Sequence, residues 1–204
     1  MELHLNFKLF LIFAFVAAIT VTSCDNQNHS SDYKKEIEEY REQVKDFFKH
    51  SEDSPVVDMT EKIIPFYYEP KLEYKVDAFL EEFAEKDTLE MLTTQSDVRK
   101  MIRFGELNFK LKDEKFSLTA YINTEHPESF FIPFHDETNG SETYEAGRYI
   151  DLEITNTKKY LLDFNLAYNP YCYYNAKYSC PIVPDDNYLK TKIEAGEKSH
   201  NESH

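Results

Sequence analysis

The stretch LNFKLKDEKFSLTAYI, residues 107–122, decides the fold class of this chain. Its apolar side chains recur at every second position before and after a polar run at residues 112–115. That period places the apolar side chains on one face of a β-strand, and a short polar run between two such strands fits a tight turn. The stretch therefore predicts a β-hairpin with one buried face.

The same period continues on both sides of the hairpin. Downstream it predicts strands at residues 130–134, 149–154 and 162–166, with Asn139-Gly140 as a turn signal. Upstream, residues 74–83 and 89–94 are further strand candidates. About seven strands with short connections favour a mainly β (α+β) fold, in which an antiparallel meander closes into a barrel or sandwich.

A helical period precedes the strands. Tyr33, Ile37, Tyr40, Val44 and Phe48 are spaced by three or four residues, with charged side chains between them. This spacing is typical of an amphipathic helix with one buried face. Because its polar face is mixed rather than basic, we expect the helix to pack on the β domain rather than bind anionic lipid.

The composition limits the class of protein. The chain has 204 residues, with 38 acidic and 23 basic side chains and a formal net charge of -15. This excess of acid argues against nucleic acid as a partner, since phosphate binding needs a basic surface. Hydrophobic residues make up 41% of the chain, enough to bury a core. We expect one globular domain at residues 33–197 and a frayed tail at 198–204.

The N-terminus predicts export. Residues 9–21 form an apolar run after Lys8, which is typical of a signal peptide and shorter than the about 20 residues that cross a bilayer. The run ends in Val21-Thr22-Ser23-Cys24, which resembles the bacterial lipobox. We expect cleavage of residues 1–23, lipid on Cys24 and a flexible tether at 24–32. The domain would then lie outside the cytoplasm in the cell envelope, anchored to a bacterial membrane.

Two polar segments, residues 131–151 and 162–197, hold the candidate binding residues. In the strand expected at 162–166, Asp163 and Asn165 share one face and lie about 7 Å apart. They could hold a ligand, or they could satisfy a buried arginine and a loop backbone. Arg148 is the candidate ion-pair partner of Asp163. Tyrosines and amides at 165–178 suit sugars or flat ligands, although tyrosines also complete small β cores.

The remaining cysteines, Cys172 and Cys180, have three open interpretations. In an exported protein a disulfide is the default, and it would close a loop of about nine residues. Zinc would need two further ligands, and the spacing matches neither a ribbon nor a finger. Free or redox-active thiols are the third possibility. His135 and Asp136 are neighbours on a strand and face opposite sides, so they do not form a catalytic pair with each other.

The polar segments resemble an uncharacterised bacterial and archaeal family, domain of unknown function 1684. The matching strings are FIPF at 131–134, DET at 136–138, TYEAGRY at 143–149, DFN at 163–165, YNPYC at 168–172, CP at 180–181 and AGE at 195–197. The likeness extends from residue 33 to 197, while TTQS at 93–96 departs from the expected Thr-Ser-Gly. The family has no established activity. The resemblance implies a shared pattern that contains Arg148, Asp163, Asn165, Asn169, Cys172, Cys180 and Glu197. Members without export signals also carry both cysteines, which weakens the disulfide interpretation.

These observations predict a lipid-anchored extracytoplasmic protein that binds a small molecule or a partner. Its polar pocket would consist of Arg148, Asp163, Asn165, Asn169 and Glu197 beside the loop at 172–180. The alternative is a hydrolase or metal-dependent enzyme that uses Asp163 with Cys172 and Cys180, or with His135. In a third interpretation the same residues form a structural clasp for the C-terminal segment. The sequence assigns no metal and no cofactor.

Overall fold

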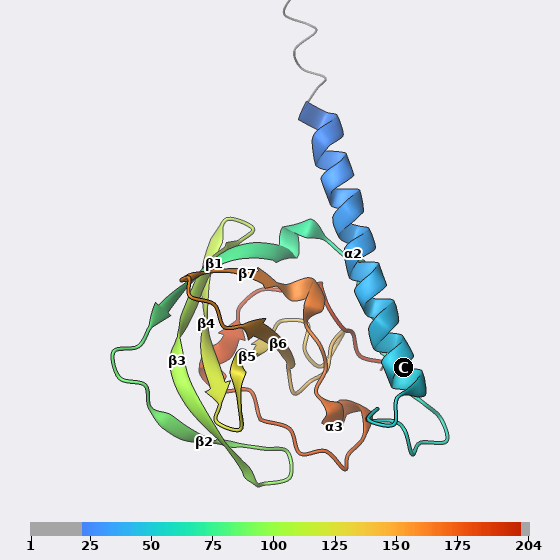
Figure 1. Cartoon of the computed structure of the whole chain (residues 1–204), viewed down its shortest axis with the longest axis vertical. Helices are drawn as coiled ribbons and strands as arrows, with labels where there is room; N and C mark the ends of the chain where they lie inside the picture. Colours follow the sequence, from blue (N-terminus) through green and yellow to red (C-terminus); the bar gives the residue numbers. More distant parts are fainter. Residues whose placement is uncertain (1–21, 201–204) are drawn as a thin grey trace, which may run out of the picture.

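One curved sheet and one long helix make up most of the molecule (Figure 1). The structure, a computed structural model, describes residues 22–200. The predicted signal peptide at 1–23 therefore lies almost wholly outside the described residues, as do residues 201–204. The helices are α2 (Thr22–His50) and α3 (Tyr171–Tyr174), and the strands are β1 (Lys75–Glu82), β2 (Thr88–Leu92), β3 (Val98–Leu111), β4 (Glu114–Asn123), β5 (His126–Asp136), β6 (Arg148–Glu153), β7 (Lys159–Asp163) and β8 (Tyr188–Leu189).

The sheet has the strand order β6-β5-β4-β3-β1-β7, and β2 pairs with β3. These pairs are all antiparallel, whereas the short β8 runs parallel to β5. The sheet curls into a half-barrel. The predicted mainly β fold with an antiparallel meander is thus confirmed, and the closed barrel or sandwich is not confirmed.

The hairpin predicted from residues 107–122 is present as β3 and β4. Leu107 lies opposite Leu118 and Phe109 opposite Phe116, in the register that the alternating pattern requires. Leu107 and Leu118 are buried in a core shared with Phe130 and other side chains of β1, β5, β6 and β7. Burial of each such side chain stabilises the fold by about 1.5 to 3 kcal/mol.

The strand expected at 162–166 is shorter than predicted. β7 ends at Asp163, whose carboxylate accepts a hydrogen bond from the backbone N–H of Asn165 at 3.0 Å. This cap begins a 3-10 helix at Phe164–Leu166, so the chain turns where the alternating pattern alone would continue a strand. Asp163 and Asn165 therefore do not present parallel side chains on one strand face.

The helix α2 begins at Thr22 and includes residues 24–32, which were predicted as a flexible tether. Tyr33, Ile37 and Phe48 are buried, as the period predicted, while Tyr40 is 44% exposed. The N-terminal part of α2 projects beyond the sheet and its C-terminal part lies beside α3 (Figure 1). Among the described residues, no helix is long and apolar enough to cross a membrane.

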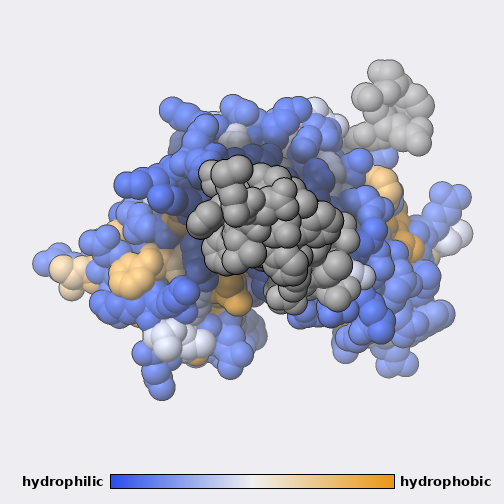
Figure 2. Space-filling view, turned by 90° about the horizontal axis from the view of Figure 1, so that it is seen from above, coloured by the Kyte–Doolittle hydropathy of each residue, from blue (hydrophilic) through white to orange (hydrophobic). Residues whose placement is uncertain are grey.

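The end of the domain is held against the body of the protein. The backbone N–H of Lys198 donates to the carbonyl of Phe66 at 2.8 Å, and that of Ser199 donates to Glu142 at 3.0 Å. Residues 198–200, predicted as part of a frayed tail, are therefore hydrogen bonded. The surface seen along α2 is mostly hydrophilic, with small separate hydrophobic areas, which fits the net charge of -15 (Figure 2).

Candidate functional site

A cleft of about 720 Å³ lies between α2, the strands β3 to β6 and the C-terminal segment. Its volume is within the range of ordinary small-molecule sites. Tyr40 and Val44 come from α2, Phe131 from β5, and Tyr149 and Asp151 from β6. The remaining lining comes mainly from residues 166–171, 178–181 and 197. The cleft therefore forms only when segments far apart in the sequence pack together.

Aromatic rings form much of the cleft wall. Six tyrosines line it: Tyr40, Tyr67, Tyr149, Tyr168, Tyr171 and Tyr178. The ring of Tyr149 meets Phe131 edge-on at 4.7 Å and Tyr168 edge-on at 5.8 Å. This packing fixes the rings relative to one another, so the wall is a preformed aromatic surface.

Asp151 places a carboxylate on the same wall. It lies opposite Phe131 in the pairing of β5 with β6, and its Oδ2 accepts a hydrogen bond from the Tyr168 hydroxyl at 2.6 Å. Asp151 is exposed on the cleft wall, and partial desolvation by the surrounding protein raises the pKa of its carboxyl. No lysine, arginine or histidine of the described residues forms an ion pair with Asp151.

Glu197 lies at the buried end of the cleft with 3% of its surface exposed. Its carboxylate accepts hydrogen bonds from the Tyr174 hydroxyl at 2.5 Å and from the backbone N–H of Asn169 at 2.8 Å. Burial raises the pKa of Glu197 from its ordinary value of 4.5 to about 7, although these donors oppose the increase. Glu197 therefore exchanges a proton near neutral pH.

Asn169 lies beside Glu197 and is 2% exposed. Its Nδ2 donates to the carbonyl of Lys198 at 3.0 Å, while its Oδ1 is buried and accepts no hydrogen bond from the described residues. A buried acceptor without a donor costs about 1 to 3 kcal/mol. Of the five predicted pocket residues, Asn169 and Glu197 are the two that line the cleft.

Arg148 has a different partner from the one predicted. Its Nη2 contacts Asp136 at 2.8 Å, and both side chains are fully buried. Its guanidinium also donates to the carbonyls of Ile193, Ala195 and Glu197. The predicted pair with Asp163 is thus wrong. Because Arg148 follows the Gly147 turn, it begins β6 beside the end of β5, where Asp136 is the nearest acid.

Asp163 and Asn165 form part of a separate buried network. The Tyr33 hydroxyl of α2 contacts both carboxylate oxygens of Asp163, at 2.9 and 2.8 Å. The side chain of Asn165 donates to the carbonyl of Lys71 and accepts from its backbone N–H, each at 2.9 Å. These contacts join α2, the segment before β1 and the end of β7. These partners are protein groups, so the network holds α2 and the segment before β1 rather than a ligand. The C-terminal segment of the clasp interpretation is held by Arg148.

Cys180 lines the cleft and Cys172 lies beside it, and both thiols are free in this structure. The backbone N–H of Cys172 contacts the Cys180 sulfur at 3.1 Å. A hydrogen bond from the Cys180 thiol lowers the pKa of Cys172, and hydrogen bonds from Thr94 and Tyr144 act in the same direction. The same bond raises the pKa of Cys180. A disulfide between them stays a prediction.

The residues of the enzymatic alternative are dispersed. His135 lines a second cavity of about 630 Å³ with Asp136, Glu137 and Asp185, whereas Asp163 contacts Tyr33 and Asn165. Among the described side chains, those of residues 30–200, no three His, Cys, Asp or Glu are grouped so that they could hold a metal ion. The structure thus does not bring Asp163 together with His135 or the cysteines.

The sequence missed most of the cleft. The alternation at 149–154 does put Tyr149 and Asp151 on one strand face, but that pattern gives no reason to expect an aromatic wall opposite them. Tyr40 and Tyr67 carry no local signal of a shared site. The one available clue was the density of tyrosine and amide side chains at 165–178, which does border the cleft.

Comparisons with known proteins place the chain in a family. Residues 64–198 match the family model described as Protein of unknown function (DUF1684). An uncharacterised protein of Haloarcula marismortui, solved in solution by NMR, is 30% identical, with a TM-score of 0.64 over 84% of this chain and 97% of that chain. No curated protein matches. With its half-barrel fold and the motifs at 131–149 and 163–197, this chain belongs to the DUF1684 family.

Proposed function

We propose that this chain is a lipid-anchored extracytoplasmic protein that binds a small molecule in the cleft. The observation that carries the proposal is the combination of a cleft of about 720 Å³, rings fixed by mutual contact, and the buried Asn169 oxygen without a donor. Binding sites characteristically combine apolar walls with a few polar groups that fix orientation. A ligand that donates to Asn169 would remove an unfavourable buried acceptor.

The proposal moves the binding residues away from the clasp. Arg148, Asp163 and Asn165 have protein partners at hydrogen-bond distance, so a ligand would have to displace those partners. Asn169 and Glu197 remain in the proposed site, and Asp151 and the tyrosines join them. Of the pocket residues predicted from the sequence, Arg148, Asp163 and Asn165 thereby have a structural role, and Asn169 and Glu197 belong to the cleft.

The anchor part of the proposal concerns Cys24. Lipid on this residue would attach the membrane to the N-terminal end of α2, whose other end forms one side of the cleft. The cleft residues of α2 begin at Tyr40, about 24 Å along the helix from Cys24, so an upright helix would hold the cleft clear of the bilayer surface. Labelling of cells with a palmitate analogue tests this part: Cys24→Ala should abolish incorporation, whereas Cys172→Ala should not.

Ligand binding is tested by blocking the cleft. Ser129 lines it from β5, and Ser129→Trp should fill the space beside Phe131. Ser117 lies on exposed surface of β4, so Ser117→Trp is the matched control. Neutral saccharides and flat heterocycles are added to protein with isotope-labelled tyrosine rings, and the ring signals are followed by NMR. We expect shifts in the wild type and the control and none in Ser129→Trp. Equal shifts in all three proteins would contradict the proposal.

A further inference from the structure

Two side chains of the cleft wall, Asn169 and Asp151, offer hydrogen-bond acceptors that the protein does not fully use. Asn169 offers a buried carbonyl oxygen without a donor, and Asp151 accepts a single hydrogen bond, from Tyr168. A carboxylate has room for about four hydrogen bonds. A ligand that satisfies both residues must therefore bring N–H or O–H donors to this part of the wall.

One acid of the cleft wall, Asp151, has no ion-pair partner in the described part of the chain, whereas the basic side chains nearby have partners of their own. Two basic side chains line the cleft, Arg99 and His126, and each lies beside its own carboxylate. Arg99 contacts Asp97 at 3.2 Å and His126 contacts Glu128 at 3.8 Å. Lys177 near the rim pairs with Asp58 at 3.1 Å. Asp151 has no such partner among the residues described, so its negative charge is not matched within the protein.

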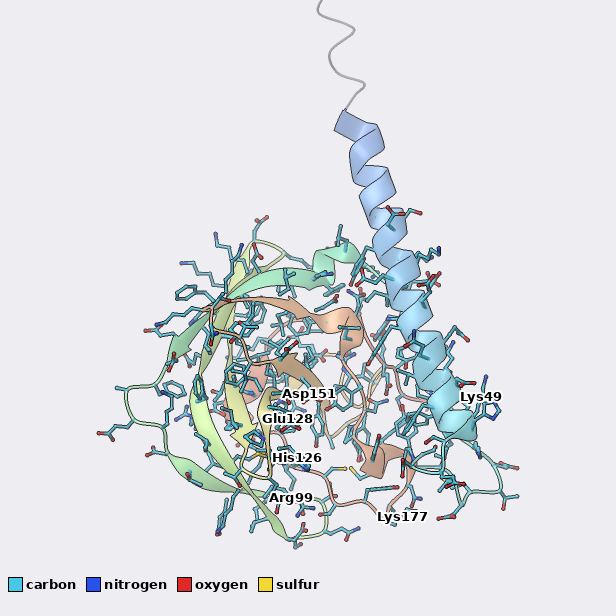
Figure 3. The ribbon with its side chains drawn as sticks, viewed as in Figure 1. Lys49, Arg99, His126, Glu128, Asp151 and Lys177 are labelled. Carbon is cyan, nitrogen blue, oxygen red and sulfur yellow. The ribbon has the colours of Figure 1, made fainter. Side chains whose placement is uncertain are left out.

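The labelled side chains in Figure 3 show this separation. In this view the labels of Asp151, Glu128, His126 and Arg99 follow one another across β6, β5 and β3, while Lys49 lies near the end of α2 and Lys177 after α3. Lys49 and Lys177 are not among the residues that line the cleft. Arg99, His126 and Lys177 each contact another acid, and no described basic side chain forms an ion pair with Asp151.

Tyrosine rings lie on the cleft wall next to Asp151. Tyr168 donates a hydrogen bond to Asp151 and packs edge-on against Tyr149, and Tyr40 lines the same cleft. Burial is the main cause that raises the pKa of Tyr40 and Tyr168, and the charge of Asp151 acts in the same direction. An aromatic face attracts a cation through its quadrupole, and the attraction is larger where water is excluded. A carboxylate beside such rings favours an ammonium group that can also donate hydrogen bonds.

We infer that the cleft selects an organic ammonium ion with N–H donors, held between Asp151 and the tyrosine rings. The inference rests on the proposed function, because it names the ligand class of the same cleft. The ammonium would donate to Asp151, and a second donor of the ligand would reach Asn169. Neutral sugars and organic anions of the same size should bind more weakly than an ammonium ion, because they lack the charge that pairs with Asp151.

Three shape-matched probes test the inference on the full-length protein. Tyramine carries an ammonium group, 4-hydroxyphenethyl alcohol replaces it with a hydroxyl, and 4-hydroxyphenylacetate replaces it with a carboxylate. Calorimetric titration should give tyramine an affinity at least about tenfold higher than either analogue. Because the interaction is charged, tyramine binding should also weaken as salt is added.

Variants assign the effect to Asp151. Asp151→Asn should lower tyramine affinity about tenfold and leave the alcohol unchanged. Asp77→Asn is the matched control, since Asp77 is an exposed acid of β1 outside the cleft. Tyr40→Leu removes a ring of the cleft that has no hydrogen bond among the described residues, and should weaken tyramine about threefold. Circular dichroism checks that each variant is folded.

The outcomes separate the inference from the proposed function. If the alcohol or the carboxylate binds as tightly as tyramine, or if Asp151→Asn changes nothing, the inference is overturned while the cleft remains a small-molecule site. If tyramine fails to bind at about 10 mM, the inference is likewise overturned. If Ser129→Trp also leaves every ligand response unchanged, the proposed function fails as well.

Discussion

Replacement of Arg148 by methionine should destabilise the protein by about 3 to 5 kcal/mol, the cost of removing one partner from a buried ion pair. Both Arg148 and Asp136 are fully buried, and their contact distance is 2.8 Å. Methionine preserves much of the side-chain length but removes all donors to Asp136 and to the carbonyls of Ile193, Ala195 and Glu197. The C-terminal segment would therefore lose its attachment to β6.

The hydrogen bonds that Asp136 keeps place the expected loss of stability at the low end of that range. Asp136 retains hydrogen bonds from the Thr138 backbone at 2.9 Å, the Thr138 hydroxyl at 2.6 Å and the backbone N–H of Ile193 at 3.2 Å. Its charge is therefore not left without donors, and we expect a loss near 3 kcal/mol. Arg148→Lys keeps the charge but has one nitrogen for four acceptors, so it should cost about 1 to 2 kcal/mol.

Urea denaturation followed by circular dichroism measures these losses. Lys192→Met is the matched control, because Lys192 is a cation of the same segment whose ion pair with Glu142 is exposed. Its loss should stay below about 1 kcal/mol. The double variant Arg148→Met/Asp136→Leu should regain part of the stability, since no buried charge remains unpaired. A loss for Arg148→Met no larger than the control would refute the clasp.

Three further predictions follow from the buried end of the cleft and its surroundings. Because the pKa of Glu197 is raised from 4.5 to about 7, its ionisation should reduce folding stability by about 2 to 3 kcal/mol between pH 5 and 8, and Glu197→Gln should lose this slope in denaturation curves. Gly196→Ala should destabilise far more than Gly140→Ala: φ is 76° and 77°, but a Cβ at Gly196 would lie 2.6 Å from the Ala167 carbonyl, against a nearest contact of 3.9 Å at Gly140. Because the pKa of Cys172 is lowered and that of Cys180 is raised, Cys172 should react with iodoacetamide faster than Cys180 at neutral pH. Mass spectrometry of timed samples measures the two rates, and equal rates would contradict this prediction.

The sign of the Glu197 effect follows from its two pKa values. In the unfolded chain the carboxyl ionises near 4.5, whereas in the folded protein it holds its proton up to about pH 7. The folded state therefore binds more protons between these values, and its stability falls as the pH rises through them. A slope of equal size in Glu197→Gln would show that another group is responsible.

The fold was predictable where the pattern is local. The hairpin at 107–122 and the helix at 33–48 follow from periods of two and of three to four residues, which act through the immediate chain geometry. The predicted strand at 162–166 ends early, at Asp163, for an equally local reason. The side chain of Asp163 competes with the sheet by capping the backbone of Asn165, and periodicity does not record such competition.

The site was predictable only in part, because ion pairs depend on which strand ends meet. Arg148 and Asp136 are brought together by the pairing of Phe134 with Arg148 at the ends of β5 and β6. The sequence offered Asp163 as an equally acceptable acid, since charge and residue type do not encode distance. Tertiary pairing decided between the two acids.

By itself, the sequence determined the mainly β fold, the amphipathic helix, the acidic surface and the family pattern, because each is carried by residue type and short-range spacing. Only the tertiary structure decided that Arg148, Asp163 and Asn165 hydrogen bond to protein groups, while Asp151, Asn169 and Glu197 line a tyrosine-walled cleft. The physical reason is that burial and hydrogen-bond saturation depend on contacts among α2, the β5–β6 edge and the C-terminal segment, which lie far apart along the chain.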